Sequence, residues 1–202
     1  MAKTLSALRD DINTFTGDSS NNIWTAAQKN LAINLAIQAA WPDIKAVAVT
    51  SFTLAEGSYI YTLTALTRAP WGPQQVWCAT SATATPVYRQ LRGSVYKRRE
   101  GDTWELCFDK TFVDNRDGYI VQVYYNQQYP ELSGDSDTTE VPEAFLLPRA
   151  LWELANMQCL KGHHTDVVIF KQKAPDFFEQ AERERVKHQT LPLADTIALR
   201  WE

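Results

Sequence analysis

The spacing of apolar residues changes twice along the 202-residue chain, and this change constrains the fold more than any other feature. Toward both ends, apolar residues recur every three or four positions, as they do on one face of an α-helix. Between residues 45 and 125 they recur at every second position, as they do on one face of a β-strand. The sequence therefore predicts an α+β fold, in which helices from both ends pack together around an inserted antiparallel sheet.

The N-terminal part predicts two helices, over residues 4–16 and 25–41. Thr4 is a suitable N-cap for the first helix, and Gly17 follows it as a C-terminal stop. Thr25 opens the second helix in a capping box, with a glutamine three positions later. The first helix carries the apolar stripe Leu5, Leu8, Ile12 and Phe15. The side of the second helix expected to be buried consists of Ala27, Leu31, Leu35, Ile37 and Trp41.

The C-terminal part predicts two more helices, over residues 142–161 and 166–189. Pro142 suits the first position of a helix, whereas Pro148 is expected to kink it and Pro175 to break the second helix. The buried stripe expected on that last helix is Val167, Phe170, Ala174, Phe177, Phe178 and Ala181. Four helices with one apolar stripe each predict a four-helix bundle.

The β insertion, residues 45–125, predicts an antiparallel sheet or a small sandwich of about six strands. β-branched and aromatic residues are frequent there, and glycines separate the strand-like runs. Glu100-Gly101-Asp102 predicts a hairpin turn between two of these strands. We expect a single domain over residues 1–189, with an extended C-terminal arm over residues 190–202.

The composition excludes several classes of protein. Apolar residues make up 45% and charged residues 22% of the chain, as in soluble globular proteins. No apolar run is long enough for a transmembrane helix, and no apolar stretch precedes Arg9 as it would in a secretory signal. Cys78, Cys107 and Cys159 are odd in number and widely spaced, which favours free thiols in a reducing compartment.

Motifs for catalysis or metal binding are scarce. His163 and His164 are adjacent and would point about 100° apart on a helix, so they do not form one metal site. There is no glycine-rich phosphate loop and no nucleophile elbow. Asp135 and Asp137 suit the start of a calcium loop, but the remaining ligands are missing. The sequence thus predicts no catalytic residue, no metal and no cofactor, although a hydrolase with two carboxylates in a cleft stays an alternative.

Charge is unevenly distributed. Residues 1–100 hold ten Lys/Arg and six Asp/Glu, whereas residues 101–141 hold two Lys/Arg and nine Asp/Glu. This asymmetry fits complementary contacts between neighbouring copies, and equally fits ordinary solvated charges. The basic run Lys97-Arg98-Arg99 is followed at once by acidic residues. It could contact DNA phosphates or a neighbouring subunit, and the alternative is a charged strand end. The candidate basic residues are Arg89, Arg92, Lys97, Arg98 and Arg99.

The last segment of the sequence, residues 190–202, is short but unusually apolar. A solvated tail does not normally carry this many large apolar side chains. We therefore expect an arm that binds a partner, and the alternative is an arm that folds back onto its own domain. Its candidate binding residues are Leu191, Leu193, Ile197, Leu199 and Trp201.

Two loose motifs accompany this order of elements. One runs from Leu8-Arg9-x-x-Ile12 through Trp24 and Asn34-x-Ala36 to Trp41-Pro42, and the other is Val141-Pro142-Glu143-x-Phe145 before an Ala- and Leu-rich helix. Together they resemble the head-to-tail adaptor (connector) proteins of tailed bacteriophages, of the tail-tube-A or portal-accessory kind. The resemblance covers most of the chain.

The resemblance implies a structural protein of the virion neck, assembled in the host cytoplasm and involved in viral genome packaging. It implies a homo-oligomeric ring of twelve copies, docked under the portal protein by the C-terminal arm. Such a ring extends the DNA channel, in which contacts with the passing DNA are independent of its sequence. It presents a site for the next neck, nozzle or tail protein, and no membrane is among its expected partners. The alternative is a carbohydrate- or receptor-binding β module of a virion, with an exposed aromatic row formed by Tyr59, Tyr61 and Trp77.

Overall fold

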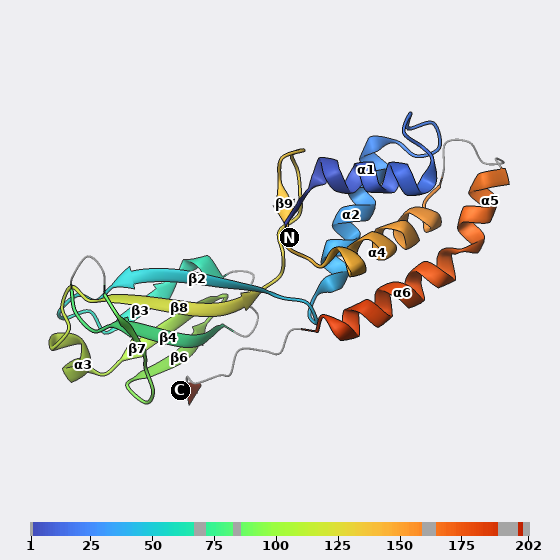
Figure 1. Cartoon of the computed structure of the whole chain (residues 1–202). Helices are drawn as coiled ribbons and strands as arrows, with labels where there is room; N and C mark the ends of the chain where they lie inside the picture. The colour runs from blue at the N-terminus through green and yellow to red at the C-terminus, as the bar shows by residue number, and fades with distance from the viewer. Residues whose placement is uncertain (1, 67–71, 83–85, 159–164, 190–197, 200–202) are drawn as a thin grey trace. The chain divides into compact units, whose positions relative to one another are not determined.

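The computed structural model describes residues 2–66, 72–82, 86–158, 165–189 and 198–199. The chain divides into two compact units. The helical unit consists of residues 1–45 and 128–190, and the β unit consists of residues 46–127 and 191–202. Figure 1 shows the long helices in the first unit and the two larger sheets in the second. The α+β class is thus confirmed, and the β insertion begins and ends within two residues of its predicted bounds.

Five helices of the described chain belong to the helical unit: α1 (Leu5–Thr16), α2 (Ala26–Ala40), α4 (Glu143–Asn156), α5 (Thr165–Gln172) and α6 (Ala174–Lys187). Local capping explains where the first two begin. The Thr4 side chain accepts a hydrogen bond from the backbone N–H of Ala7, and Thr25 forms the expected capping box with Gln28. Gly17 ends α1 with a φ of 68°, a left-handed conformation that glycine adopts without steric cost.

The predicted four-helix bundle is not confirmed, because the last predicted helix is divided into α5 and α6. The division falls at Lys173, just before Pro175, which lacks a backbone N–H and is tolerated only in the first turn of a helix. In addition, α4 ends at Asn156, before the predicted end at Lys161. Pro148 lies inside α4 without ending it.

The core of the helical unit forms where α4 packs against α2 on one side and α6 on the other (Figure 1). The side chains with almost no solvent exposure in this core include Leu8, Ile12, Ile33, Ile37, Phe145, Leu151 and Leu154. Four side chains that we expected to be buried are exposed instead: Phe15 at 54%, Leu31 at 52%, Phe178 at 37%, and Ala27. The helix α2 is rich in alanine and leucine on several sides, so periodicity alone does not fix which side faces the core.

A two-stranded antiparallel ribbon borders the helices. It pairs β1 (Lys3–Thr4) with β9 (Thr138–Thr139). The sequence predicts only a polar loop around β9, because two residues are too few to show an alternating pattern.

The β unit contains two four-stranded sheets. The first has the order β2-β8-β4-β5 and the second has the order β10-β6-β7-β3. All neighbouring strands are antiparallel except β10 and β6, which are parallel. The strands are β2 (Ala46–Thr53), β3 (Ile60–Leu63), β4 (Pro73–Ala79), β5 (Tyr88–Gln90), β6 (Val95–Glu100), β7 (Thr103–Phe108), β8 (Ile120–Gln127) and β10 (Ala198–Leu199).

The two sheets share a second core, to which Val76, Val121 and Val123 contribute from one sheet and Val95 and Leu106 from the other. The predicted hairpin between β6 and β7 is confirmed, with Glu100 opposite Thr103. Two short helical segments were not predicted. They are α3 (Lys110–Asp114) and the 3-10 helix η1 (Thr64–Leu66).

Candidate interaction surfaces

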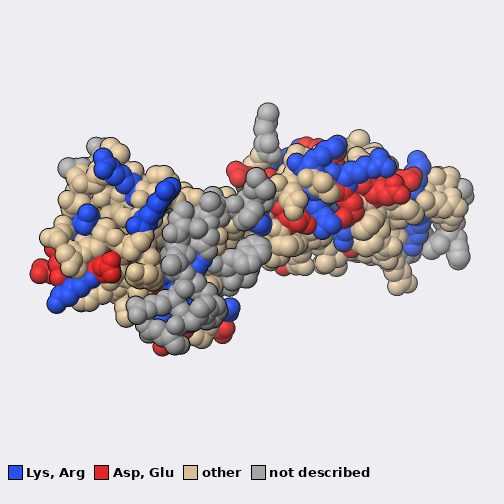
Figure 2. All heavy atoms as spheres, turned by 90° about the horizontal axis from the view of Figure 1, so that it is seen from below, with Lys and Arg blue, Asp and Glu red and all other residues tan. Residues whose placement is uncertain are grey.

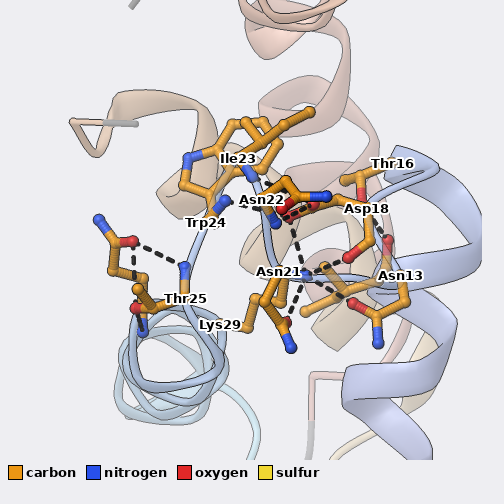
Figure 3. A network of polar contacts seen from close by, with 11 residues as sticks. Asn13, Thr16, Asp18, Asn21, Asn22, Ile23, Trp24, Thr25 and Lys29 are labelled. Carbon is orange, nitrogen blue, oxygen red and sulfur yellow. Dashed lines mark hydrogen bonds and ion pairs between the residues drawn. The ribbon is translucent and has the colours of Figure 1, made fainter. Parts of the chain in front are cut away.

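The turn between α1 and α2 closes around Lys29, whose side chain is fully buried (Figure 3). Its Nζ atom donates hydrogen bonds to Asn13 Oδ1 at 2.6 Å, Asn21 Oδ1 at 2.9 Å and the Asp18 carbonyl oxygen at 2.7 Å. It also lies 3.0 Å from Asp18 Oδ2. Four oxygen atoms therefore replace the water that the ammonium group loses on burial.

The Asp18 carboxylate holds the other side of this turn. It accepts hydrogen bonds from the backbone N–H groups of Asn22, Ile23 and Trp24 at 2.7, 3.1 and 3.0 Å. Burial alone raises the pKa of Asp18, but these N–H groups and the Lys29 ammonium outweigh burial and lower the pKa below its ordinary value. Asp18 is thus ionised and fixes the angle at which the chain enters α2. The sequence signal for this network is Lys29 itself, the only charged residue of α2.

Charges of both signs alternate on the surface of the helical unit. Figure 2 shows acidic and basic side chains interspersed there. Along α4 and α6, the guanidinium groups of Arg149, Arg183 and Arg185 lie 2.8, 3.1 and 2.6 Å from glutamates of the same helix. Along these two helices, each of the three guanidinium groups is therefore paired with a carboxylate of its own helix.

A small apolar cavity of about 360 Å³ also lies in this unit. It is lined by side chains from α1, α4 and α6, among them Phe15, Leu147 and Phe177. It has room for one or two large side chains, but nothing in the structure shows what fills it.

The predicted basic run lies in the β6–β7 hairpin, and its side chains are engaged within the hairpin or the core. Lys97 is only 5% exposed. Arg98 donates two hydrogen bonds to Glu105 Oε2, at 2.9 and 2.7 Å, across the strand pair. Arg99 donates to the Gly101 carbonyl oxygen at 3.2 Å. The run therefore supports the hairpin, and Lys97 does not lie on the surface.

The other two predicted basic residues, Arg89 and Arg92, do lie together. Both line a cavity of about 920 Å³ between the β4–β5 region and the segment that follows α3. Arg116, which was not predicted, is a third guanidinium group in the same lining. Among the described residues that line this cavity there is no aspartate or glutamate. Among the described residues, none of the three arginines forms an ion pair with a carboxylate.

Arg116 is the most firmly held of the three arginines. Its guanidinium carbon lies 4.2 Å from the centre of the Phe112 ring, and its Nη1 donates to the Phe112 carbonyl oxygen at 3.2 Å. Stacking on an aromatic face fixes the group while leaving its remaining N–H donors available. The sequence did not reveal this residue because it is distant along the chain from Arg89 and Arg92.

The predicted arm falls almost wholly outside the described residues. Leu191, Leu193, Ile197 and Trp201 lie outside them. Leu199 belongs to the short strand β10, which pairs with Tyr96 and Lys97 of β6. Portal binding by this arm stays a prediction.

The described residues give no support for the side chains considered for chemistry. His163, His164 and Cys159 lie outside the described residues, which contain no group of three or more potential metal ligands. Asp137 Oδ2 accepts hydrogen bonds from the N–H groups of Gly134 and Ser133, both at 2.8 Å, and therefore closes its own turn. In the described parts of the chain, no helix is long and apolar enough to cross a membrane.

The aromatic row of the alternative β module is not present. Tyr61 stacks on Phe52 with ring centres 4.4 Å apart, and Tyr59 packs against the second core. Trp77 lies in the other sheet and contacts Tyr124 instead. The three aromatic side chains therefore do not form one exposed surface.

A helical unit formed from both ends of the chain, with an inserted β unit, is the element order that the apolar periodicity predicted and on which the resemblance to head-to-tail adaptors rests. The comparison with protein families identifies the class: the chain belongs to the SU10 adaptor protein family, whose sequence model matches residues 3–187. No curated protein sequence matches the chain.

Several solved chains are similar to this chain at a low level, and one of them is described as "Neck of empty GTA particle computed with C6 symmetry". It is 10% identical in sequence, with a TM-score of 0.32, and the match covers 86% of this chain and 94% of that chain. A TM-score of this size does not establish a shared fold.

Proposed function

We propose that this protein is a structural head-to-tail adaptor of a phage virion, which forms a ring under the portal. The ring extends the DNA channel and presents the attachment site for the next neck or tail component. The observation that carries this proposal is the match of the adaptor family to residues 3–187, nearly the whole chain. The protein acts by contact and without catalysis, in the neck of the virion after assembly in the host cytoplasm.

A ring requires that one surface of each copy binds a different surface of the next copy. Such head-to-tail contacts close when the rotation between copies divides a full turn evenly. Twelve copies are expected from the resemblance to head-to-tail adaptors. The two compact units supply two chemically different surfaces, one with mixed charge and one with an arginine-lined cavity.

The arm supplies the contact with the portal protein. Burial of one leucine, isoleucine or tryptophan side chain contributes about 1.5–3 kcal/mol. Five such residues in each copy, repeated around a ring, outweigh the entropy lost when the arm is ordered. DNA passes through the ring without sequence-specific contacts.

The test mixes the full-length protein with its cognate portal ring and measures the mass of the complex. We expect rings of adaptor on the portal for the full chain, and none for a chain that ends at Gln189. Because this truncation also removes β10, the substitution pair Leu193→Asp and Trp201→Asp provides a second variant that keeps the strand. The control pair, Leu31→Asp and Val186→Asp, changes two exposed apolar residues outside the arm and should bind normally. A full-length protein that stays monomeric and ignores the portal would contradict the proposal.

A further inference from the structure

The arginine-lined cavity of the β unit has the features of an anion-binding site. It has a volume of about 920 Å³ and is lined by Arg89, Arg92 and Arg116, and none of the described lining residues is a carboxylate. A guanidinium group pairs with carboxylate or phosphate through two parallel hydrogen bonds, which favours a planar, oxygen-rich ligand. Because Arg116 is stacked on Phe112, part of this site is ordered before any ligand binds.

The surroundings of the cavity favour an acidic polypeptide over a DNA duplex. Residues 46–127 hold eight Lys/Arg and seven Asp/Glu, so this segment has almost no net charge. Asp109, Asp114 and Asp117 lie in and beside α3, which borders the cavity, and they would repel an extended polyanion. Tight duplex binding usually involves many phosphate contacts over a broad basic surface. Three arginines in a hollow suit a few carboxylates on a short segment.

The chain itself contains one segment with the required charge. Residues 117–148 hold six Asp/Glu and no Lys or Arg. Within this segment, the loop of residues 131–140 carries exposed carboxylates at Glu131, Asp135 and Glu140. The Asp135 carboxylate pairs with Arg9 at 3.0 Å while remaining 69% exposed. Exposed ion pairs of this kind contribute little to stability and are easily exchanged.

The acidic loop is also held in one shape before it binds. The Asp137 carboxylate closes the turn through Ser133 and Gly134. Backbone hydrogen bonds from Leu5 to the Asp137 carbonyl oxygen at 2.9 Å, and from Ser6 to that of Asp135 at 3.2 Å, fasten it to the start of α1. A loop that is already ordered loses little entropy when it enters a cavity.

We propose that the Arg89–Arg92–Arg116 cavity of one copy binds the acidic loop, residues 131–140, of a neighbouring copy. The two surfaces lie in different compact units of the chain, as a head-to-tail contact requires. This inference rests on the proposed ring. It names the side chains that join one subunit to the next.

Two variants with reversed charges test the two surfaces of the proposed contact one at a time. The cavity variant, Arg89→Glu with Arg92→Glu, keeps the loop, and the loop variant, Asp135→Arg with Glu140→Arg, keeps the cavity. We expect each variant alone to assemble at least tenfold more weakly than the wild type, measured by sedimentation velocity over a concentration series and by mass on the portal. All four substituted side chains are exposed, so the fold should persist, and circular dichroism checks this.

Mixing the two variants gives the sharpest readout. The intact loop of the cavity variant fits the intact cavity of the loop variant, and the reversed loop of the loop variant fits the reversed cavity of the cavity variant. We therefore expect the mixture to assemble into rings in which the two variants alternate. A chain that carries all four reversals should form rings again, because both members of the pair have changed sign. The control pair, Arg99→Glu with Arg183→Glu, makes the same change in net charge at exposed arginines outside the cavity and should assemble like the wild type.

Three outcomes would overturn the inference. The first is normal assembly of either single-sided variant, and the second is failure of both the mixture and the fourfold reversal to restore contact. The third is that the cavity variant loses at least tenfold affinity for a short DNA duplex while its assembly is unchanged, which would assign the cavity to nucleic acid. These outcomes differ from failure of the proposed function, in which the wild type itself forms no ring with the portal.

Discussion

A buried ammonium group destabilises a protein by several kcal/mol unless other atoms replace its hydration. At Lys29, the replacement comes from side-chain and backbone oxygens of the turn between α1 and α2. The same turn supplies the N–H groups that hold Asp18. The Lys29–Asp18 ion pair and these hydrogen bonds therefore hold the turn between α1 and α2 in one conformation (Figure 3).

Replacing Lys29 by methionine should lower the free energy of unfolding by about 3–5 kcal/mol, because Asp18 is left buried without its partner. The double substitution Lys29→Met with Asp18→Asn should recover part of this loss, since no unpaired charge remains. Lys187→Met, at an exposed position on α6, is the control and should change stability by less than about 0.5 kcal/mol. Chemical denaturation measures all three, and equal stability of the Lys29 and Lys187 variants would contradict the structural role.

The lowered pKa of Asp18 predicts how stability depends on pH. The unfolded chain binds this proton more readily than the folded chain does, so the stabilisation is complete above the ordinary pKa of 3.8 and is lost as the pH falls through the folded value. Asp18→Asn removes this contribution, so its unfolding free energy should fall less steeply in acid. Urea midpoints between about pH 2 and pH 6 test this, and parallel profiles would show that Asp18 is not involved.

At the scale of single elements, capping chemistry determines where the helices begin. In the capping box of α2, the Gln28 N–H donates to Thr25 Oγ1 at 3.1 Å, and the Thr25 N–H donates to Gln28 Oε1 at 2.9 Å. Thr25→Ala should therefore cost about 0.5–2 kcal/mol of stability, whereas Thr25→Ser keeps the hydroxyl and should cost much less. Thermal unfolding of the two variants provides the measurement, and equal losses would exclude the hydroxyl as the cause.

These helix starts were predictable because their determinants lie within four residues of each other. The buried face of α2 was not, since Leu31 and Ala32 are both apolar and only packing against α4 decides which one faces the core. Likewise, Arg89 and Arg92 were found from their spacing, but Arg116 joins them only through the fold of the β unit. The sequence thus predicts local contacts well and distant ones poorly.

At the scale of the whole molecule, the two hydrophobic cores share no residue. The helical core is built from both ends of the chain and the β core from its middle, so the chain passes between them at residues 45–46 and 127–128. Separate cores can open separately, because each unit holds its own buried apolar contacts. An adaptor with this organisation can lose order in one unit while the other stays folded.

Two matched cavity-forming substitutions test this independence. Leu106 has no solvent exposure in the β core, and Leu151 is 2% exposed in the helical core. Either change to alanine should cost about 2–5 kcal/mol. With Leu106→Ala, amide hydrogen exchange should accelerate across β7 and β8 but not in α2 and α4, and Leu151→Ala should show the reverse pattern. Faster exchange throughout both units in either variant would mean that the two cores unfold as one cooperative body.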